Sequence, residues 1–274
     1  MADILPFRLH LTGDTADENQ FQGYDGYMAL AGFALTLSLI ANFAETGEIR
    51  WRGDFPGRHA VRAFTPEPGS FIADFKVWLE KNPAQALRLP VTGPTTPNFF
   101  YELVRRVIGR NIGNDEPIKD PTLQQLIERR EGDVESLVAR TEAPIRQAHS
   151  VIGNGALSMD ILGGFSVLGN FNEKTRDYVK ANIEDPKQTT KNFTVNAFAA
   201  NSGNGGLFDP DLHRSVPFSM SKDVLVQCGA IFSWGLDQYV RRTSKTVRVT
   251  YTRILAMDGT PKKYIVLRAD ANDP

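Results

Sequence analysis

The sequence predicts an α+β protein. We expect an N-terminal antiparallel sheet packed by an apolar helix, a helical middle region, and a small C-terminal β-barrel-like domain with one helix, for which an OB-like arrangement is one option. Three observations predict this: alternating apolar and polar residues near both ends, an uncharged stretch over 26–44, and helical periodicity between them. We place domains at 1–82, 83–150 and 151–274.

The N-terminal region contains the clearest periodic signals. Apolar residues alternate with polar ones from Leu5 to Leu11 and again over 71–80, and each alternation is typical of a half-buried strand. Between them, a helix is expected from Gln22 to Thr46 with Gly47 as its C-terminal stop. Its uncharged part has about the minimum length for a bilayer span, but its many small and polar residues favour a buried core helix, and we expect no membrane contact.

The middle of the chain changes character twice. Proline and threonine are frequent over 82–97, which favours a linker or long loop. Apolar residues then recur at helical spacing over 99–113 and 121–147, where Gly132 and Pro144 are expected to weaken or bend the second helix.

The C-terminal region is predicted to be rich in strands. Gly163 and Gly164 are expected to turn a hairpin, and a strand over 192–197 is followed by the glycine-rich turn 201–206. The next strand, 214–220, contains Pro217, so we expect it at a sheet edge or beside a bulge. A helix capped by Ser221 and a final hairpin turning at 258–260 complete the order.

Composition narrows the function classes. The chain has 274 residues with 31 basic and 32 acidic side chains, so its net charge of -1 predicts no global attraction to nucleic acid or anionic membranes. Its single cysteine, Cys228, excludes an internal disulfide and a cysteine-rich zinc site, and is expected to be a buried core thiol. We expect no secretion signal in the first residues, a cytoplasmic location, and no cofactor.

Two candidate sites surround the glycine-rich turn. Asp209, Asp211 and His213 alternate, so an extended segment would present two oxygens and one nitrogen to a divalent metal, although a turn in which aspartate bonds the backbone is favoured. Gly203, Asn204 and Gly205 could cradle an anion, but no lysine or helix start follows them, which favours a plain hairpin loop.

Basic residues cluster around the last hairpin. Strands that carry basic and aromatic side chains bind single-stranded nucleic acid through phosphate contacts and base stacking. The alternative, a solvated charged face, is favoured here. The residues concerned are Arg214, Lys245, Arg248, Tyr251, Arg253, Lys262 and Lys263.

Several stretches carry a resemblance to a known family. QAHSVIGNGALSMDILGG, NSGNGGLFDPDLHRSVPFSM and TRILAMDGTPKKYIV, together with LAGFALTLSLIANFAETGEIR and TPEPGSFIADF, resemble an uncharacterised family of bacterial proteins of similar length, a domain of unknown function. The resemblance covers nearly the whole chain. It implies no activity and no binding residue.

Three function hypotheses follow. The first is a non-enzymatic binding or assembly protein that works through protein–protein contacts as a homo-oligomer or with another bacterial protein. The second is a nucleic-acid or nucleotide-binding protein, in phage defence or regulation, which uses the basic hairpin and the Gly203 loop. The third is a metal-dependent hydrolase at Asp209, Asp211 and His213.

Overall fold

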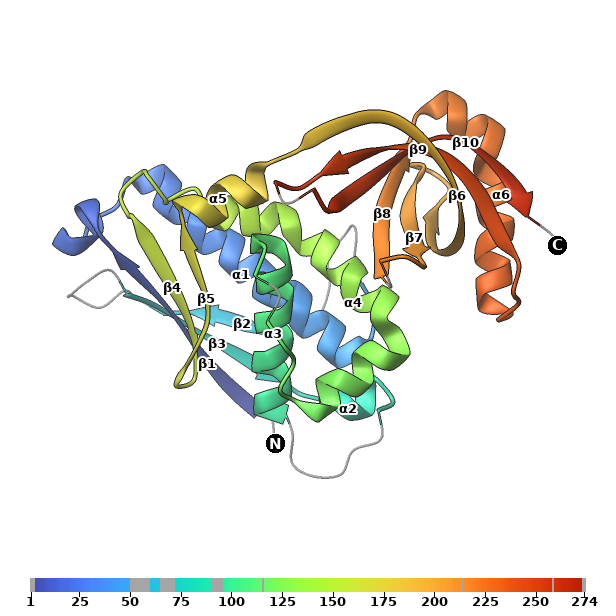
Figure 1. Ribbon diagram of the computed structural model, residues 1–274. Helices are drawn as coiled ribbons and strands as arrows, with labels where there is room; N and C mark the ends of the chain where they lie inside the picture. The colour runs from blue at the N-terminus through green and yellow to red at the C-terminus, as the bar shows by residue number, and fades with distance from the viewer. Residues whose placement is uncertain are drawn as a thin grey trace. The chain divides into compact units, whose positions relative to one another are not determined.

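The protein is described by a computed structural model that covers residues 3–49, 60–64, 72–89, 96–114, 116–212, 214–257 and 259–272. It is an α+β protein, as the sequence predicts, and it forms two compact units (Figure 1). The first unit comprises Met1–Arg130 and Arg140–Lys180, and the second comprises Glu131–Ala139 and Ala181–Pro274.

The first unit is built on a five-stranded antiparallel sheet in the order β2-β3-β1-β4-β5. Its central strand β1 pairs with β3 on one side and with β4 on the other, and the two-residue turn Gly164–Phe165 joins the last pair of strands. Gly164 has a φ of 59°, a value that glycine adopts without strain. The strands are β1 (Asp3–Thr12), β2 (Val61–Ala63), β3 (Ile72–Leu79), β4 (Ser158–Gly163) and β5 (Ser166–Asn172).

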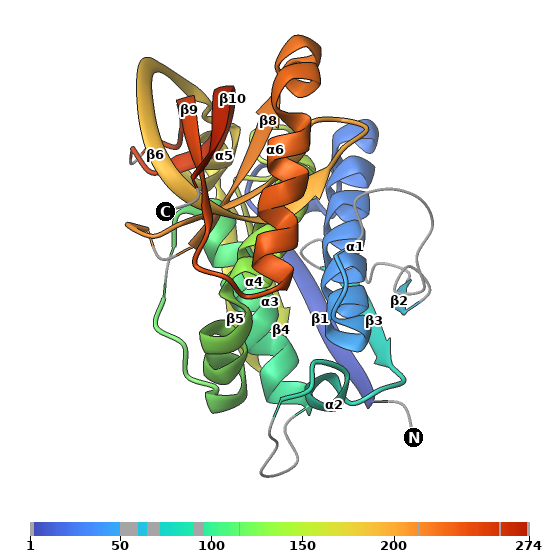
Figure 2. The same cartoon turned by 90° about the vertical axis from the view of Figure 1, so that its right-hand side faces the viewer.

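Helices cover one face of this sheet. α1 (Gly23–Thr46) and α3 (Thr96–Ile112) lie on the same side of the strands (Figures 1 and 2). The buried ring of Phe7 meets Phe33 of α1 at 6.5 Å and Phe100 of α3 at 6.0 Å between ring centroids. Three elements therefore share one apolar core, and the other sheet face remains uncovered by these helices. The remaining helical elements are η1 (Asp14–Glu18), α2 (Pro83–Ala86), α4 (Pro121–Ala148) and α5 (Glu173–Lys180).

The helix α1 is the uncharged stretch of the sequence. Among the described residues it alone is long and apolar enough to cross a bilayer by length and composition, and 67% of its most apolar part is buried within the protein. Gly47 ends it in the left-handed conformation with a φ of 69°, as predicted. This burial is the packing expected of a core helix.

Two expectations for the middle of the chain change. The short helix α2 interrupts the predicted linker, because Asn82 caps it by accepting a hydrogen bond from the Ala84 amide at 3.0 Å. The predicted bend in α4 falls at Arg130, whose φ of −141° and ψ of 36° are not helical. Pro144 lies further along, inside the helix.

The second unit is a closed five-stranded barrel in the order β6-β7-β8-β10-β9. Along the chain, the helix α6 (Lys222–Val240) lies between β8 and β9. Only β8 and β10 pair in parallel, and this arrangement is OB-like. α6 lies along the barrel and is seen lengthwise in Figure 2. The barrel strands are β6 (Ile183–Ala199), β7 (Asn204–Asp209), β8 (Arg214–Met220), β9 (Thr246–Leu255) and β10 (Pro261–Asn272).

The predicted strands and helix of the C-terminal region are present, but the predicted position of the Pro217 strand at a sheet edge is not. Ser221 caps α6 by accepting a hydrogen bond from the Val224 amide at 3.3 Å, as expected. The edge alternative for Pro217 was wrong, because the barrel is closed and β8 lies between β7 and β10. The bulge alternative agrees with the register, since Pro217 pairs opposite Gly206, beside the register shift between β6 and β7. Pairing with β10 begins only at Phe218, so Pro217 lies just outside that ladder and its missing N–H costs no hydrogen bond there.

The two units divide the chain differently from the sequence-based boundaries. β4 pairs with β1 through six residue pairs, which places 158–172 in the N-terminal sheet instead of the C-terminal domain. The helical region 83–150 forms no separate body, since α3 packs on the same sheet. Strand pairing between distant segments decides this, and local periodicity carries no information about it.

Candidate functional site

Asp209, one of the predicted metal ligands, is the centre of a buried polar network in the barrel. Its side chain is 3% exposed at the end of β7. One carboxylate oxygen accepts hydrogen bonds from Lys191 Nζ and from the Asp211 amide, the latter at 2.9 Å, and the other accepts one from the Tyr264 hydroxyl at 2.5 Å. Lys191 Nζ also lies 2.6 Å from the exposed Asp211 carboxylate. We call these four residues the Asp209 network.

The charges of the network follow from these contacts. Burial alone would raise the pKa of Asp209, but the hydrogen bonds from Lys191 and Tyr264 outweigh it and hold that pKa below its usual value. Burial would likewise lower the pKa of Lys191, yet the two aspartates raise it. Burial and the Asp209 carboxylate raise the pKa of Tyr264. At neutral pH the network therefore contains a carboxylate, an ammonium and a neutral phenol.

This geometry supports a structural role for Asp209. Both of its oxygens are engaged, and the Lys191 ammonium stands where a cation bound to this carboxylate would lie. The hydrogen bond that the Asp211 amide donates to the Asp209 carboxylate is the turn contact that the sequence favoured. In the part of the chain that the structure describes, no three His, Cys, Asp or Glu side chains are grouped to hold a metal ion, and His213 lies outside that part.

The Gly203 loop closes on itself. The Gly203 amide donates to the Ala199 carbonyl at 3.0 Å, and the Gly203 carbonyl accepts from the Met220 amide at 3.0 Å. A side chain at Gly203 would lie 2.7 Å from the Met220 side chain, and its φ is 68°, so the position requires glycine. Asn204 and Gly205 are paired residues of β7. The amide of Gly203 is thus used within the turn and is not available to an anion.

The basic residues of the last hairpin separate into groups. Arg253 Nε donates to Asp185 near the start of β6 at 2.9 Å, and Lys262 Nζ donates to the carbonyl of Ala181, which precedes that strand, at 2.9 Å. The hydrogen bond from the Lys187 amide, and after it the one from Arg253, lower the pKa of Asp185. These two side chains act as internal links of the barrel.

Arg214 is also engaged, and the other basic residues lie apart. Its guanidinium donates to the Pro261 carbonyl at 2.9 Å and lies 3.5 Å from Glu135. Gly203 lies beside Met220, at the opposite end of β8 from Arg214. Arg248 is exposed near the start of β9, whereas Lys263 pairs opposite its far end, and Lys245 precedes the strand. The candidate residues therefore do not converge on one cleft.

Tyr251 faces the barrel interior. It is 4% exposed, and its ring centroid lies 4.4 Å from that of Tyr264 and 5.4 Å from that of Phe193. Burial and the Asp209 charge raise its pKa. This ring belongs to the barrel core and is not placed to stack on a base. Cys228 is likewise buried, 4% exposed, on the inner side of α6.

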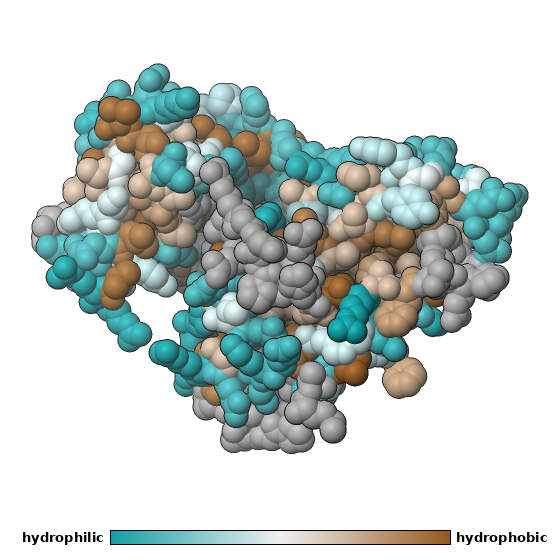
Figure 3. Space-filling model, turned by 180° about the vertical axis from the view of Figure 1, so that it is seen from behind, coloured by the Kyte–Doolittle hydropathy of each residue, from teal (hydrophilic) through white to brown (hydrophobic). Residues whose placement is uncertain are grey.

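A second candidate lies on the uncovered face of the first unit. Exposed apolar residues interrupt the hydrophilic surface of the protein (Figure 3). Phe165, at the β4–β5 turn, is fully exposed, and Phe64, after β2, is 44% exposed. Both line a groove of about 650 Å³ over the outer sheet face. We call it the sheet groove, and its principal side chains are Arg8, Phe64, Asp74, Lys76, Leu162 and Phe165.

Strand register explains how the sheet groove is assembled. Asp74 pairs opposite Arg8, which pairs opposite Leu162, and Leu162 pairs opposite Val167. The Phe64 amide donates to the Asp74 carbonyl at 2.9 Å, which adds Phe64 to the same row. Paired residues project to the same side of a sheet, so five strands or their extensions contribute to one outward row.

The groove contains one ion pair. Arg8 donates to Asp74 through Nε at 2.7 Å and Nη2 at 2.9 Å, a bidentate contact. These hydrogen bonds hold the pKa of Asp74 below its usual value against the opposing effect of burial. Lys76 Nζ lies 4.7 Å from the Phe64 ring centroid. The surface thus combines apolar side chains with charged groups in fixed positions.

The sequence does not reveal this groove. Alternation over β3 predicts that Asp74, Lys76 and Trp78 face outward. It does not predict that Phe64 and Phe165, about a hundred residues apart, line the same hollow, since that depends on the strand order. The one local signal is Phe165 itself, a large apolar residue in a glycine turn.

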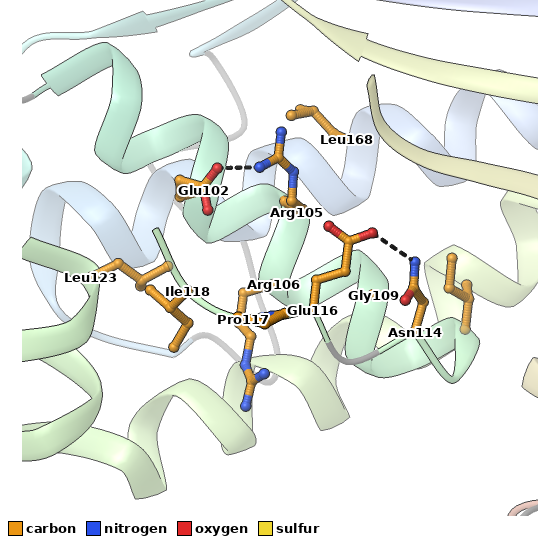
Figure 4. Close-up of a pocket in the computed structure, with 11 residues that line it drawn as sticks. Glu102, Arg105, Arg106, Gly109, Asn114, Glu116, Pro117, Ile118, Leu123 and Leu168 are labelled. Atoms are coloured by element: carbon orange, nitrogen blue, oxygen red, sulfur yellow. Dashed lines mark hydrogen bonds and ion pairs between the residues drawn. The ribbon is translucent and has the colours of Figure 1, made fainter. Parts of the chain in front are cut away.

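A small cavity lies beside α3. It holds about 20 Å³, roughly the space of one water molecule. Figure 4 shows the Arg105 guanidinium turned toward Glu102 and the Asn114 amide toward Glu116, with Nδ2 and Oε1 3.2 Å apart in the second pair. These two pairs of polar groups at its wall therefore satisfy each other, and the space is too small for an organic ligand.

The fold and these surfaces define a two-unit α+β protein with a sheet groove and an OB-like barrel. The chain belongs to the family described as Domain of unknown function (DUF7946), whose model matches residues 7–180. That match ends at Lys180, the last residue of the first unit. No curated protein and no solved structure matches the chain.

Proposed function

We propose that this protein is a non-enzymatic binding protein that acts through protein–protein contacts, and that the sheet groove is its contact surface. The observation that carries the proposal is a fully exposed Phe165 at the rim of a groove of about 650 Å³. The principal side chains of the groove lie within the segment that matches the family model, 7–180.

Apolar exposure supports this choice of surface. Phe165, Phe64 and Val167 at 55% exposure all contribute apolar surface to the outer side of the sheet. Burying a phenylalanine side chain against a partner contributes about 1.5–3 kcal/mol, and aromatic residues that enter a pocket dominate many interfaces. A protein partner that covers this face would bury these apolar side chains, which the folded chain leaves exposed, and would gain binding free energy from their burial.

The proposal includes self-association. Phe165 projects beside the groove that it lines, so one face carries both a protruding ring and a hollow. A two-fold contact requires such a self-complementary face, because each copy then offers both parts. A cytoplasmic setting is part of the proposal and is supported by the single, buried cysteine.

Site-specific photo-crosslinking tests the surface. A photoreactive phenylalanine analogue replaces Phe165 in the full chain, and in a matched variant it replaces Val226, which is 87% exposed on α6 of the barrel. In the producing cells, position 165 should give discrete protein adducts, either with a second copy or with another protein, that position 226 does not give. Equal yields at the two positions would remove the sheet groove as the contact surface.

Nucleic-acid binding remains a second candidate because the barrel is OB-like, an arrangement that many single-strand binders use. The exposed Arg248 on β9 is the cation that would contact a phosphate group in this function. Binding of single-stranded DNA should weaken as salt rises and should weaken further in Arg248→Glu. Affinity that is independent of salt and of this substitution would exclude a phosphate-binding surface on β9.

A further inference from the structure

We infer that the sheet groove accepts a segment of a partner protein that combines carboxylate side chains with an apolar anchor. This inference rests on the function proposed above and specifies the chemistry of the partner. It is carried by the charges around the groove, which strand register places on one face.

Cations outnumber carboxylates in this part of the sheet. Arg62 pairs opposite Lys76, so both side chains project outward beside the row that contains Arg8 and Asp74. The bidentate contact between Arg8 and Asp74 neutralises one cation. Within the described residues, neither Arg62 nor Lys76 forms an ion pair with a carboxylate, which leaves two positive charges on this side of the sheet.

A further carboxylate on this face, that of Asp160, does not cancel these charges. Asp160 lies on the same face, one row away, where it pairs opposite His10. Its Oδ1 accepts a hydrogen bond from Asn170 Nδ2 at 2.7 Å, which directs it toward β5 and away from β2. The positive charge therefore stays concentrated over β2 and β3.

Both cations are held against aromatic rings. The Arg62 guanidinium lies 4.4 Å from the ring centroid of Trp78, and Lys76 Nζ lies 4.7 Å from that of Phe64. Such stacking limits the motion of the long side chains, so less entropy is lost when a carboxylate binds. An anion at this place would also meet a surface of lower dielectric than open water, which strengthens the attraction.

Apolar side chains line the rest of the groove. Leu162, Pro6 and Phe165 all line it, and Phe165 is fully exposed. A volume of about 650 Å³ accommodates several side chains, since one water molecule occupies about 30 Å³ of the liquid. A bound segment would thus place carboxylates over Arg62 and Lys76 and an apolar side chain between Leu162 and Phe165.

These features favour a peptide over a nucleic acid. Binding of a nucleic acid strand depends on a line of cations that follows many phosphates, together with aromatic faces open to bases. Here the aromatic faces of Trp78 and Phe64 are occupied by cations, and aliphatic side chains occupy the remaining surface. A protein segment fits that combination better.

Fluorescence polarisation of labelled peptides on the full chain tests the inference. One probe is a short peptide that alternates Glu or Asp with Phe, and the matched probe has Gln and Asn in place of the acids. The acidic peptide should bind more tightly and lose affinity with salt. Lys76→Gln and Arg62→Gln should each weaken it about twofold to fivefold, the range of exposed ion pairs. Lys222→Gln, at an exposed lysine that begins α6, is the control.

Three outcomes would overturn the inference. The first is equal affinity for the acidic and amide peptides, and the second is equal weakening in Lys222→Gln. The third is single-stranded DNA that, at the same total charge, competes as well as unlabelled acidic peptide. The result at position 165 separates the two proposals. Protein adducts at Phe165 without acidic-peptide binding would leave the contact surface in place and refute only the proposed partner chemistry.

Discussion

Removing one hydroxyl group should destabilise the barrel. Tyr264→Phe keeps a ring of nearly the same shape in the core, where Tyr264 is 1% exposed, but deletes the hydrogen bond to Asp209. The Asp209 carboxylate would keep its hydrogen bonds from Lys191 and from the Asp211 amide and would lose the one from the hydroxyl at position 264. Because Asp209 is 3% exposed, little water is available to replace the phenol.

The magnitude follows from the type of hydrogen bond. A bond from a hydroxyl to a buried carboxylate, here 2.5 Å between oxygens, is charge-assisted. Hydrogen bonds to charged groups contribute about 1.5–3 kcal/mol to stability. We therefore expect Tyr264→Phe to lower the free energy of unfolding of the barrel by about 2 kcal/mol, a change of about 30-fold in its opening equilibrium.

Hydrogen exchange measured by mass spectrometry localises this effect. Slowly exchanging amides of β7 and β10 should exchange faster in Tyr264→Phe by about that factor, while those of β1 and β3 keep their rates. Tyr251→Phe is the matched control, because its ring lies 4.4 Å away in the same core and no hydrogen bond of its hydroxyl is found among the described residues. Similar small effects in both variants would show that the Asp209 network does not stabilise the barrel.

Two further predictions concern the first unit. Burial lowers the pKa of His149 from 6.5 to about 4, so as the pH falls the unfolded chain binds a proton at this side chain before the folded chain does. The free energy of unfolding should therefore be constant above about pH 7 and fall by about 2 kcal/mol toward pH 5. In His149→Phe, which keeps a ring against Phe171, urea unfolding should lose that slope, and an unchanged slope would assign it to other groups. Gly32→Ala should cost about 1–3 kcal/mol in thermal unfolding, because the new Cβ would lie 2.5 Å from the Pro144 carbonyl oxygen. Gly23→Ala, with open space around it, should cost nothing, and equal losses would mean that the close helix approach is not what demands glycine at position 32.

The sequence predicted the strands and helices that depend on local pattern. Alternation identified β1 and β3, whose inner residues such as Leu9 and Val77 are fully buried. Cap chemistry placed the ends of α1 at Gly47 and of α6 at Ser221. Each of these signals comes from residues a few positions apart, so it does not depend on the rest of the fold.

The candidate site was predicted only in part. The sequence favoured a turn at Asp209 and Asp211 over a metal site, and the hydrogen bond from the Asp211 amide to Asp209 is that turn contact. Lys191 and Tyr264, which neutralise and bind Asp209, come from other strands and carry no local motif. Arg253 was taken as a candidate phosphate contact, whereas β6 brings Asp185 to it. A charged residue in isolation gives no sign of its partner, because the partner is chosen by strand register.

What the sequence by itself determined is the inventory of this protein: an apolar helix, alternating strands, a capped helix between two groups of barrel strands, and a near-neutral charge. What only the tertiary structure decided is which of these meet. β4 joins β1, the barrel closes around Tyr264, and Phe64 reaches the same groove as Phe165. The physical reason is range: periodicity and capping act within a few residues, whereas pairing between strands is selected by the burial of whole faces at once.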